Sequence, residues 1–233
     1  MLSALYLLYH RNSGTMRISG QQPTAVQSTE RITLFYQKIV NNHSNNKNQF
    51  RIIAGKWRSR KLSFPGSIST LRPTTDRIKE TVFNWLQMDL PGANCLDLFA
   101  GSGALSFEAS SRLAESVTCI DSSPDATNRI KENCELLQCD NINVIKADAL
   151  QWLSRQSDQY QFDIVFVDPP FSENMLDQCV QLLESGNCLA PDALIYIESG
   201  ASLDDLEVPD EWEQLKNSKA GQVYFGVYKR IIR

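Results

Sequence analysis

The sequence predicts an α/β fold in which helices cover both faces of a mainly parallel sheet. Two patterns indicate this fold: from Cys95 onward short apolar segments alternate with longer amphipathic ones, and the apolar segments are nearly continuous runs. Continuous apolar runs are typical of strands that are buried on both faces. The chain has 233 residues, 42% hydrophobic and 21% charged, which is enough for one sizeable domain with an extension.

Each element is placed by its own pattern. The apolar runs predict strands at Cys95–Phe99, Val117–Asp121, Asn143–Lys146, Asp163–Asp168 and Ala193–Glu198. The amphipathic segments predict helices at Ala104–Leu113, Pro124–Leu137 and Asn174–Glu184. Two last runs on either side of Gly221 predict a terminal hairpin, which we expect to join the sheet, at Trp212–Lys216 and Val223–Tyr228.

Composition divides the chain into three predicted parts. Residues 1–47 are expected to form a poorly ordered arm, because the polar tract Asn41–Asn48 cannot build a core. Residues 48–90 form a basic segment that is expected to face nucleic acid. Residues 91–233 form the domain that contains the sheet.

The basic segment is expected to contain a hairpin followed by a helix. Weak alternation on both sides of Gly55 predicts a β-hairpin over residues 50–64. Thr74 or Thr75 is a candidate cap for an amphipathic helix that continues to Leu86.

The net charge of −4 conceals how basic this segment is. Between Asn48 and Glu80 there are eight Lys and Arg residues and two acidic residues, so this stretch carries +6 and the rest of the chain −10. Such a cluster is most often a solvated surface, but it is also the footprint of a phosphate-binding face. Trp57 and Phe64 lie among the cations and favour nucleic acid. The residues expected to contact it are Arg51, Lys56, Trp57, Arg58, Arg60, Lys61 and Arg72.

Cysteine and histidine positions argue against a metal site. The six cysteines contain no Cys-x-x-Cys pair, and both histidines, His10 and His43, lie in the arm. Reduced cysteines within predicted strands and helices are typical of a cytoplasmic protein. The apolar run Leu2–Tyr9 is too short for a membrane anchor and lacks the flanks of a signal peptide, so no membrane contact is expected.

A glycine turn follows the first predicted strand. Gly101 and Gly103 lie where a strand ends and a helix begins, and glycine lets the backbone approach a ligand closely. Asp121, twenty residues after Gly101, ends the second strand and is well placed to bind ribose hydroxyls. Ser106 stands where the dinucleotide fingerprint has its third glycine, and there is no Walker lysine. The turn therefore fits neither the full dinucleotide pattern nor a phosphate loop.

Two further acids indicate the kind of ligand. Asp97, just before the turn, suits a cation such as an amino-acid ammonium or a sulfonium, and S-adenosylmethionine carries both. Asp148 ends the third strand and could accept from an adenine amino group. Their structural alternatives are a turn acid and a helix N-cap, respectively. The glycine turn, Asp121, Asp148 and Asp168, however, all fall at the C-terminal ends of predicted strands, which is the edge where open α/β sheets bind ligands.

The fourth predicted strand runs into Asp168-Pro169-Pro170-Phe171. The prolines fix φ and remove two N–H donors, so the carbonyl groups there can only accept. The carboxylate also accepts, and Phe171 offers a face for stacking. This combination suits a planar base whose exocyclic amino group attacks an electrophile. The alternative is a rigid corner between strand and loop.

Five segments together carry a family resemblance: Arg51–Arg58, Leu71–Thr81, Leu96–Leu105, Asp168–Phe171 and Ala220–Val223. They are similar to the bacterial small-subunit (16S) ribosomal RNA guanine-N2 methyltransferases. The Arg-Pro-Thr-Thr-Asp-Arg block is distinctive, whereas the glycine turn is common to the whole superfamily. The resemblance implies a Rossmann-like class I methyltransferase sheet of seven strands with the last antiparallel, and an N-terminal β-hairpin that helps to bind RNA.

The resemblance also implies roles for single residues. Small-subunit ribosomal RNA, within a small ribosomal subunit or its assembly intermediate, would be the partner, and nothing requires more than a monomer. The methionine part of S-adenosylmethionine would contact the turn, Asp121 the ribose and Asp148 the adenine. The implied cofactor-binding residues are Thr75, Asp97, Phe99, Gly101, Gly103, Asp121 and Asp148. The residues implied to hold the target guanine are Asp168, Pro169, Pro170 and Phe171.

Other functions remain open at this point. An adenine-N6 methyltransferase on DNA or RNA would use the same Asp-Pro-Pro-aromatic chemistry, and only the resemblance favours guanine. A non-catalytic ribosome assembly factor could retain the fold without activity. A nicotinamide dehydrogenase is disfavoured by Ser106 and by the lack of a hydride-transfer site.

Overall fold

The computed structural model describes residues 48–66, 76–156, 161–170 and 175–231. All of them belong to one compact unit, Asn45–Arg233. The predicted arm, residues 1–47, lies outside the described residues.

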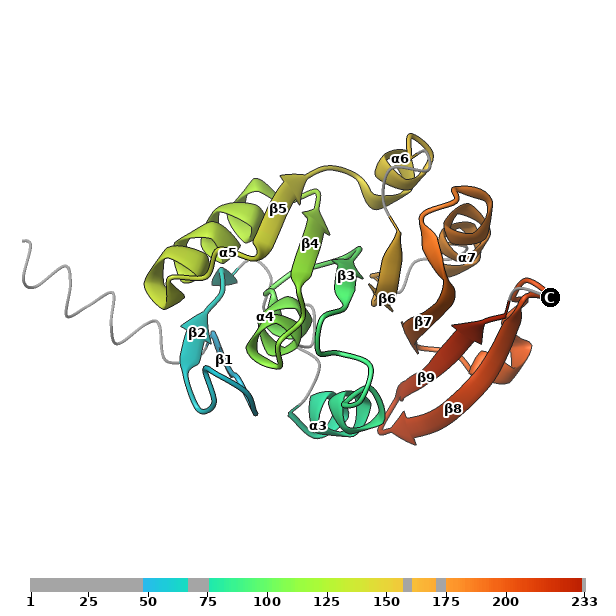
Figure 1. Cartoon of the computed structure of the whole chain (residues 1–233), viewed down its shortest axis with the longest axis horizontal. Coiled ribbons are helices and arrows are strands. Elements are labelled where there is room, and N and C mark those ends of the chain that lie inside the picture. Colours follow the sequence, from blue (N-terminus) through green and yellow to red (C-terminus); the bar gives the residue numbers. More distant parts are fainter. Residues whose placement is uncertain (1–47, 67–75, 157–160, 171–174, 232–233) are drawn as a thin grey trace, which may run out of the picture. The chain divides into compact units, whose positions relative to one another are not determined.

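The described residues form the strands and helices that Figure 1 shows in chain order. The strands are β1 (Gln49–Arg51), β2 (Lys61–Ser63), β3 (Asn94–Asp97), β4 (Ser116–Asp121), β5 (Ile142–Lys146), β6 (Phe162–Val167), β7 (Leu189–Ser199), β8 (Trp212–Ala220) and β9 (Val223–Arg230). The helices are α3 (Asp76–Trp85), α4 (Ala104–Ser111), α5 (Pro124–Leu137), α6 (Ala149–Leu153), α7 (Met175–Ser185) and the short 3₁₀ helix η3 (Leu203–Asp205).

Seven strands form the central sheet in the order β5-β4-β3-β6-β7-β9-β8. The pairs among β3 to β7 are parallel, whereas β9 is antiparallel to both of its neighbours, β7 and β8. The last strand alone therefore runs against the others, and the predicted seven-stranded sheet is confirmed. The N-terminal hairpin β1-β2 is a separate antiparallel pair.

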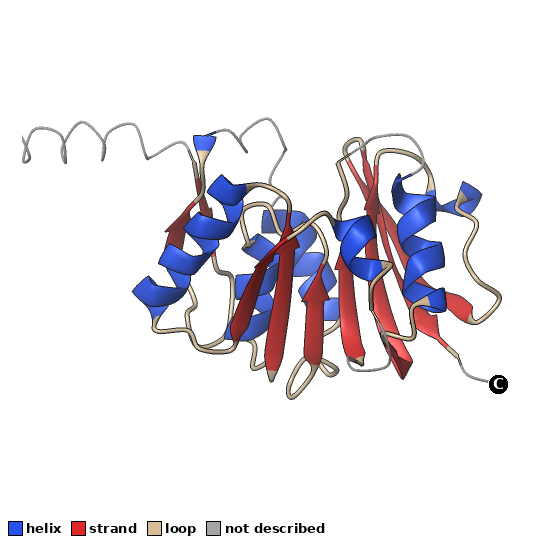
Figure 2. Cartoon of the chain, turned by 90° about the horizontal axis from the view of Figure 1, so that it is seen from above, coloured by secondary structure: helices blue, strands red, loops and turns tan. Residues whose placement is uncertain are grey.

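Helices cover both faces of this sheet, as Figure 2 shows. The side chains of α3, α4 and α5 belong to one buried cluster and those of α6 and α7 to the other. Local sequence sets the helix ends. Ser123 caps α5 by accepting from the N–H of Ala126, Pro124 follows at the first helical position, and Gln138 ends the helix with φ 52°. Leu113 has φ 74°, so α4 stops before the predicted end.

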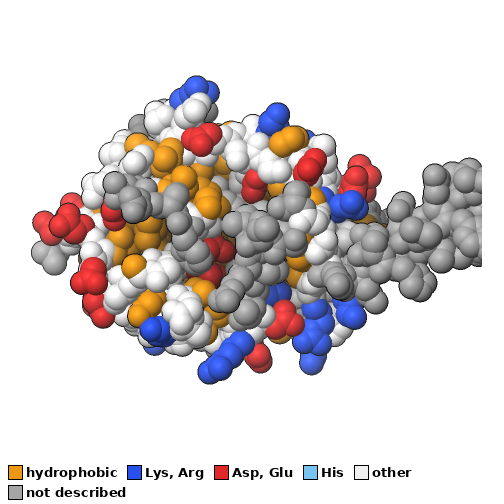
Figure 3. Space-filling view, turned by 180° about the vertical axis from the view of Figure 1, so that it is seen from behind, with side chains coloured by type: hydrophobic (Ala, Val, Ile, Leu, Met, Phe, Trp, Pro, Cys, Tyr) orange, Lys and Arg blue, Asp and Glu red, His pale blue; other side chains and the backbone are white. Residues whose placement is uncertain are grey.

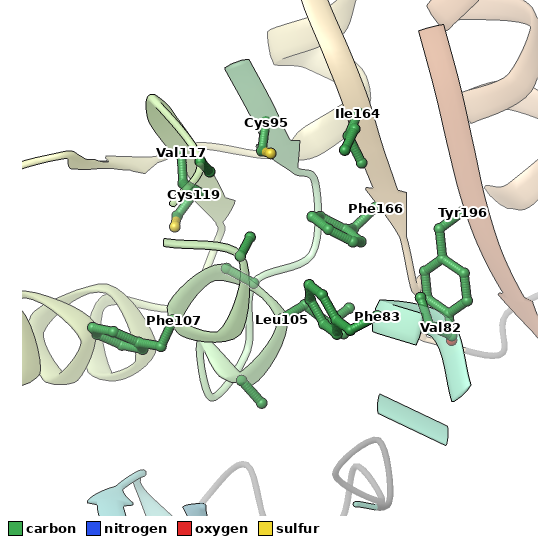
Figure 4. Close-up of a cluster of buried hydrophobic side chains, with 14 of the residues drawn as sticks. Val82, Phe83, Cys95, Leu105, Phe107, Val117, Cys119, Ile164, Phe166 and Tyr196 are labelled. Atoms are coloured by element: carbon green, nitrogen blue, oxygen red, sulfur yellow. The ribbon is translucent and has the colours of Figure 1, made fainter. Parts of the chain in front are cut away.

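One apolar cluster joins the hairpin, α3 and the sheet. Figure 4 shows Phe83 of α3 facing Phe166 of β6, and Tyr196 of β7 lies beside them. The ring centroids of Phe83 and Phe166 are 5.6 Å apart, and those of Phe50 in β1 and Phe107 in α4 are 6.1 Å apart. Because these side chains share one core, the hairpin and α3 are fixed against the sheet. The predicted division at residue 90 stays a prediction.

The structure adds observations on cysteines, on membrane-spanning helices and on metal sites. All six cysteines are free, and five of them are buried. Among the described residues, no helix has the length and apolar character that spanning a bilayer requires, and no group of His, Cys, Asp or Glu side chains has the arrangement of a metal site.

Candidate cofactor and substrate site

The carboxyl ends of β3 and β6 lie side by side where the sheet changes its winding direction. Asp97 of β3 pairs with Phe166 of β6. From β3 the chain continues to β4 and β5 on one side, and β6 lies on the other side. A switch point of this kind opens a crevice beyond the strand ends, where open α/β sheets bind ligands. This edge of the sheet is therefore the candidate site.

The turn after β3 has the backbone of a ligand cradle. Gly101 has φ 50° and Gly103 has φ 78°, both in the left-handed region that favours glycine. The N–H of Gly103 donates to the carbonyl of Ala100 at 2.6 Å, which closes the turn. Among the described residues, a Cβ on Gly101 would meet only the carbonyl oxygen of Phe99 within 4 Å, at 3.8 Å. The turn is therefore open at Gly101, as a bound cofactor requires.

Asp121 ties this turn to the end of β4. One carboxylate oxygen accepts from the N–H of Gly101 at 2.7 Å, and the other accepts from the N–H of Ser123 at 2.8 Å. Asp121 is half-buried. Each carboxylate oxygen has a further acceptor site, so these bonds leave capacity for hydroxyl donors. Binding of the ribose by Asp121 stays a prediction.

Asp97 lies beneath the turn and is only 1% exposed. Its carboxylate accepts from the hydroxyl of Ser106 at 2.5 Å. Burial, the largest influence, raises the pKa of Asp97 to about 7, and the nearby charge of Asp121 also raises it, while the Ser106 hydrogen bond opposes the rise. This hydrogen bond joins the end of β3 to the first turn of α4, the two elements that the glycine turn connects. Contact of Asp97 with the methionine part of the cofactor stays a prediction.

Asp148 and Phe99 also follow strands at this edge of the sheet, Asp148 after β5 and Phe99 after β3. Asp148 is exposed and caps α6, because its carboxylate accepts from the N–H of Gln151 at 2.9 Å. The helix-cap role is thus present, and the exposed carboxylate can still accept from an adenine. Phe99 is half-buried beside the turn. The contacts of Asp148 and Phe99 with the cofactor stay predictions.

Asp168 and Pro169 follow β6 directly, at the same edge of the sheet. Asp168 is half-buried, Pro169 is buried and Pro170 is exposed. Tyr196 lies in the neighbouring strand β7. Burial raises the pKa of Tyr196 well above its ordinary value, and the negative charges of Glu198 and Asp168 raise it further. Phe171, Thr75 and Arg72, which the sequence places at the site or on the RNA face, lie outside the described residues.

Three polar residues at this edge are absent from the sequence-based site. Ser106 holds Asp97, and the hydroxyl of Tyr196 donates to the buried Glu198 at 2.6 Å. In the sequence, Ser106 stands out only as a departure from the dinucleotide pattern. Tyr196 and Glu198 lie within a predicted strand, where sequence alone marks them as ordinary strand residues.

The predicted RNA-binding side chains lie on the hairpin. Arg51, Lys56, Arg58, Arg60 and Lys61 are all exposed, and Trp57 is half-buried. The ammonium group of Lys56 lies 4.1 Å from the centroid of the Trp57 ring, and the guanidinium of Arg51 forms an ion pair with Asp76 at 3.2 Å. Figure 3 shows one face of the molecule, with Lys and Arg side chains and acidic side chains interspersed around its rim and a few acidic side chains near its middle. The hairpin thus presents cations to solvent, and their contact with RNA stays a prediction.

A seven-stranded sheet whose last strand alone is antiparallel is the architecture of the class I methyltransferases, which use S-adenosylmethionine. A solved structure from Escherichia coli, "Putative methyltransferase yhhF", matches this fold with a TM-score of 0.73 and 42% identity, covering 80% of this chain and all of that one. The glycine turn, open at Gly101, fits this cofactor. The protein is a methyltransferase of this class.

The chain belongs to the family described as "Conserved hypothetical protein 95", whose model matches residues 50–229. A Haemophilus influenzae protein named "Ribosomal RNA small subunit methyltransferase D" is 43% identical over 187 residues, which cover 79% of this chain and 96% of that protein. An Escherichia coli K12 protein of the same name is 43% identical over 189 residues, covering 81% of this chain and 93% of that protein.

Proposed function

We propose that this protein transfers a methyl group from S-adenosylmethionine to the exocyclic N2 of a guanine in 16S ribosomal RNA. The observation that carries the proposal is the position of Asp168 and Pro169, which leave β6 directly beside the glycine turn that follows β3. An acceptor for an amino group and the cradle for a methyl donor then lie side by side at one edge of the sheet. The names of the relatives support ribosomal RNA as the substrate, and the resemblance to guanine-N2 enzymes supports guanine.

Asp168 and the carbonyl group of Pro169 act on the amino group of the base. Guanine N2 is a weak nucleophile, because its lone pair is delocalised into the ring. By accepting the two amino hydrogens, the carboxylate and the carbonyl orient the N2 lone pair and stabilise the positive charge that develops on nitrogen. Asp168 need not be a strong base, because the amino proton becomes acidic only as the new bond forms.

S-adenosylmethionine supplies an activated methyl group: the bond between N2 and the methyl carbon forms as the carbon–sulfur bond breaks, and the electron pair stays on sulfur. The amino proton leaves to Asp168 and then to water. Phe171 is expected from the sequence to stack on the base after it has left its helix or loop. The exposed cations of the hairpin hold the phosphates around that base.

Methyl transfer to small ribosomal subunits tests the proposal. The subunits are prepared from cells that lack the modification, incubated with the protein and labelled S-adenosylmethionine, and digested to nucleosides. We expect label in N2-methylguanosine. Label in N6-methyladenosine would overturn the choice of base, and the absence of transfer, in the presence of cofactor binding by calorimetry, would favour an assembly factor instead.

A further inference from the structure

The loop of the N-terminal hairpin lies on the last turns of α4, and one buried carboxylate holds it there. Glu108 has no exposed surface, and its two oxygens accept from the N–H of Ile53 at 2.7 Å and of Ala54 at 3.0 Å. Arg112, one turn later in the chain, donates to the same carboxylate at 2.8 Å. Hydrogen bonds to an ionised acceptor are about twice as strong as neutral ones, so this is a firm attachment.

Ser111 forms a second attachment to the same loop. Its hydroxyl donates to the carbonyl of Ala54 at 2.6 Å and accepts from the backbone N–H of Trp57 at 3.0 Å. Its carbonyl accepts from the backbone N–H of Lys56 at 2.8 Å. Gly55 lies between these contacts with φ 81°, and a Cβ added there would be 1.8 Å from the carbonyl oxygen of Ser111. The loop backbone therefore rests directly on the helix.

The strands of the hairpin are fixed to two further helices. Lys79 of α3 is buried and donates to the carbonyl of Arg51 at 2.8 Å. Asn133 of α5 donates to the carbonyl of Ser63 at 2.9 Å. Both contacts end on backbone carbonyl groups, so they set the position of the hairpin without using its exposed cationic side chains.

Helix α4 links this loop to the cofactor turn, because it begins immediately after Gly103 and holds the loop near its other end. We propose that Glu108 and Ser111 are positioning residues that fix the hairpin loop, residues 53–57, at one set distance from the transferred methyl group. This inference rests on the proposed function. Neither residue touches RNA or cofactor: each acts by ordering the backbone that carries Lys56 and its neighbours before RNA arrives. A surface ordered in advance loses less entropy on binding.

Neighbouring serines on α4 provide a matched comparison. Ser110 and Ser111 are both fully buried, but the hydroxyl of Ser110 donates to Asn141, at 2.6 Å, and not to the hairpin. The test compares Ser111→Ala and Glu108→Gln with Ser110→Ala. Unmodified small ribosomal subunits are the substrate, and KM and kcat are measured at several salt concentrations. Cofactor affinity is measured by calorimetry, and the thermal midpoint shows the loss of stability in each variant.

We expect Ser111→Ala and Glu108→Gln to raise KM for the subunits about five- to tenfold, with kcat and cofactor affinity nearly unchanged. The salt dependence of KM should keep its slope, because the same phosphates are bound once the loop is ordered. Ser110→Ala should lose stability without this change in KM. If Glu108→Gln is too unstable to purify, Ser111→Ala still tests the inference, because it removes only one hydroxyl group.

Two results would overturn this inference but leave the proposed function intact. One is equal KM values for Ser111→Ala and Ser110→Ala. The other is a loss of cofactor affinity in Ser111→Ala and Glu108→Gln by the same factor as the rise in KM. The first would reduce Ser111 to a stabilising contact. The second would mean that the helix acts through the cofactor turn. No methyl transfer by the unaltered protein would overturn the proposed function, and this inference with it.

Discussion

The hydroxyl of Ser106 in α4 donates a hydrogen bond to the buried carboxylate of Asp97 at the end of β3, at 2.5 Å. Ser106 occupies the place of the third glycine in the dinucleotide fingerprint, where glycine allows close packing of helix and strand. Here the position carries a donor instead, which joins the first turn of α4 to the strand before the glycine turn. The departure from the fingerprint is therefore part of how this turn is held.

Replacing Asp97 by Asn should change the dependence of stability on pH. Burial raises the pKa of Asp97 from 3.8 to about 7 in the folded protein, so the folded state binds this proton more tightly than the unfolded state. The resulting stabilisation is fully present below about pH 4 and is lost as the pH rises to about 7. Its size is on the order of 4 kcal/mol.

Urea denaturation of both proteins between pH 4.5 and pH 8 measures this effect. Asn does not titrate, so the free energy of unfolding of the wild-type protein relative to Asp97→Asn should fall steadily up to about pH 7 and then level off. The comparison removes the contributions of all other carboxyl groups. A difference that stays constant across this range would contradict the raised pKa.

The fold could be predicted because its strands and helices have strong local patterns. Every strand and helix expected from Cys95 onward is present, and so is the hairpin around Gly55. The short helix α6 was not expected, because its five residues contain too little amphipathic pattern. Contacts that join distant segments also could not be foreseen. Glu108, for example, accepts from a loop 54 and 55 residues earlier, and nothing in the sequence near it indicates that partner.

Replacing Asp168 by Ala should abolish methyl transfer and leave cofactor affinity nearly intact. The carboxylate is proposed to accept an amino hydrogen of the base, and the loss of such an interaction typically lowers kcat by about 100-fold or more. Asp163 lies at the opposite end of the same strand and accepts from the N–H of Asn94 at 2.8 Å. Asp163→Asn is therefore the control, which should lose stability but retain turnover per folded molecule. Unchanged turnover of Asp168→Ala would rule out the proposed role.

Neutralising the exposed cations of the hairpin should weaken RNA binding and reduce its dependence on salt. In a variant with Lys56, Arg58 and Arg60 changed to Gln, each lost phosphate contact should lower the slope of log K against log salt by about 0.7 to 0.9. A matched variant removes the same charge from exposed sites on α5 and β8. Its substitutions are Lys131→Gln, Lys216→Gln and Lys219→Gln. Filter binding of small-subunit RNA at several salt concentrations measures both slopes. Equal slopes for the two variants would contradict the proposed RNA face.

The two glycines of the glycine turn, Gly101 and Gly103, should respond differently to replacement by Ala. At Gly101, with φ 50°, the added methyl group meets no described atom closer than 3.8 Å, so stability should fall by only about 1 kcal/mol while the methyl group enters the space assigned to the cofactor. At Gly103, with φ 78°, it would lie about 3.0 Å from the ring of Phe107 and 3.1 Å from Ile130, in the packing of α4. Gly101→Ala should therefore weaken S-adenosylmethionine binding more than Gly103→Ala does, and Gly103→Ala should lower the thermal midpoint more than Gly101→Ala does.

Calorimetric titration with cofactor and thermal unfolding measure the two effects. Equal losses of affinity in both variants would mean that the glycines serve the same purpose and that the open side of the turn at Gly101 is not where the cofactor lies.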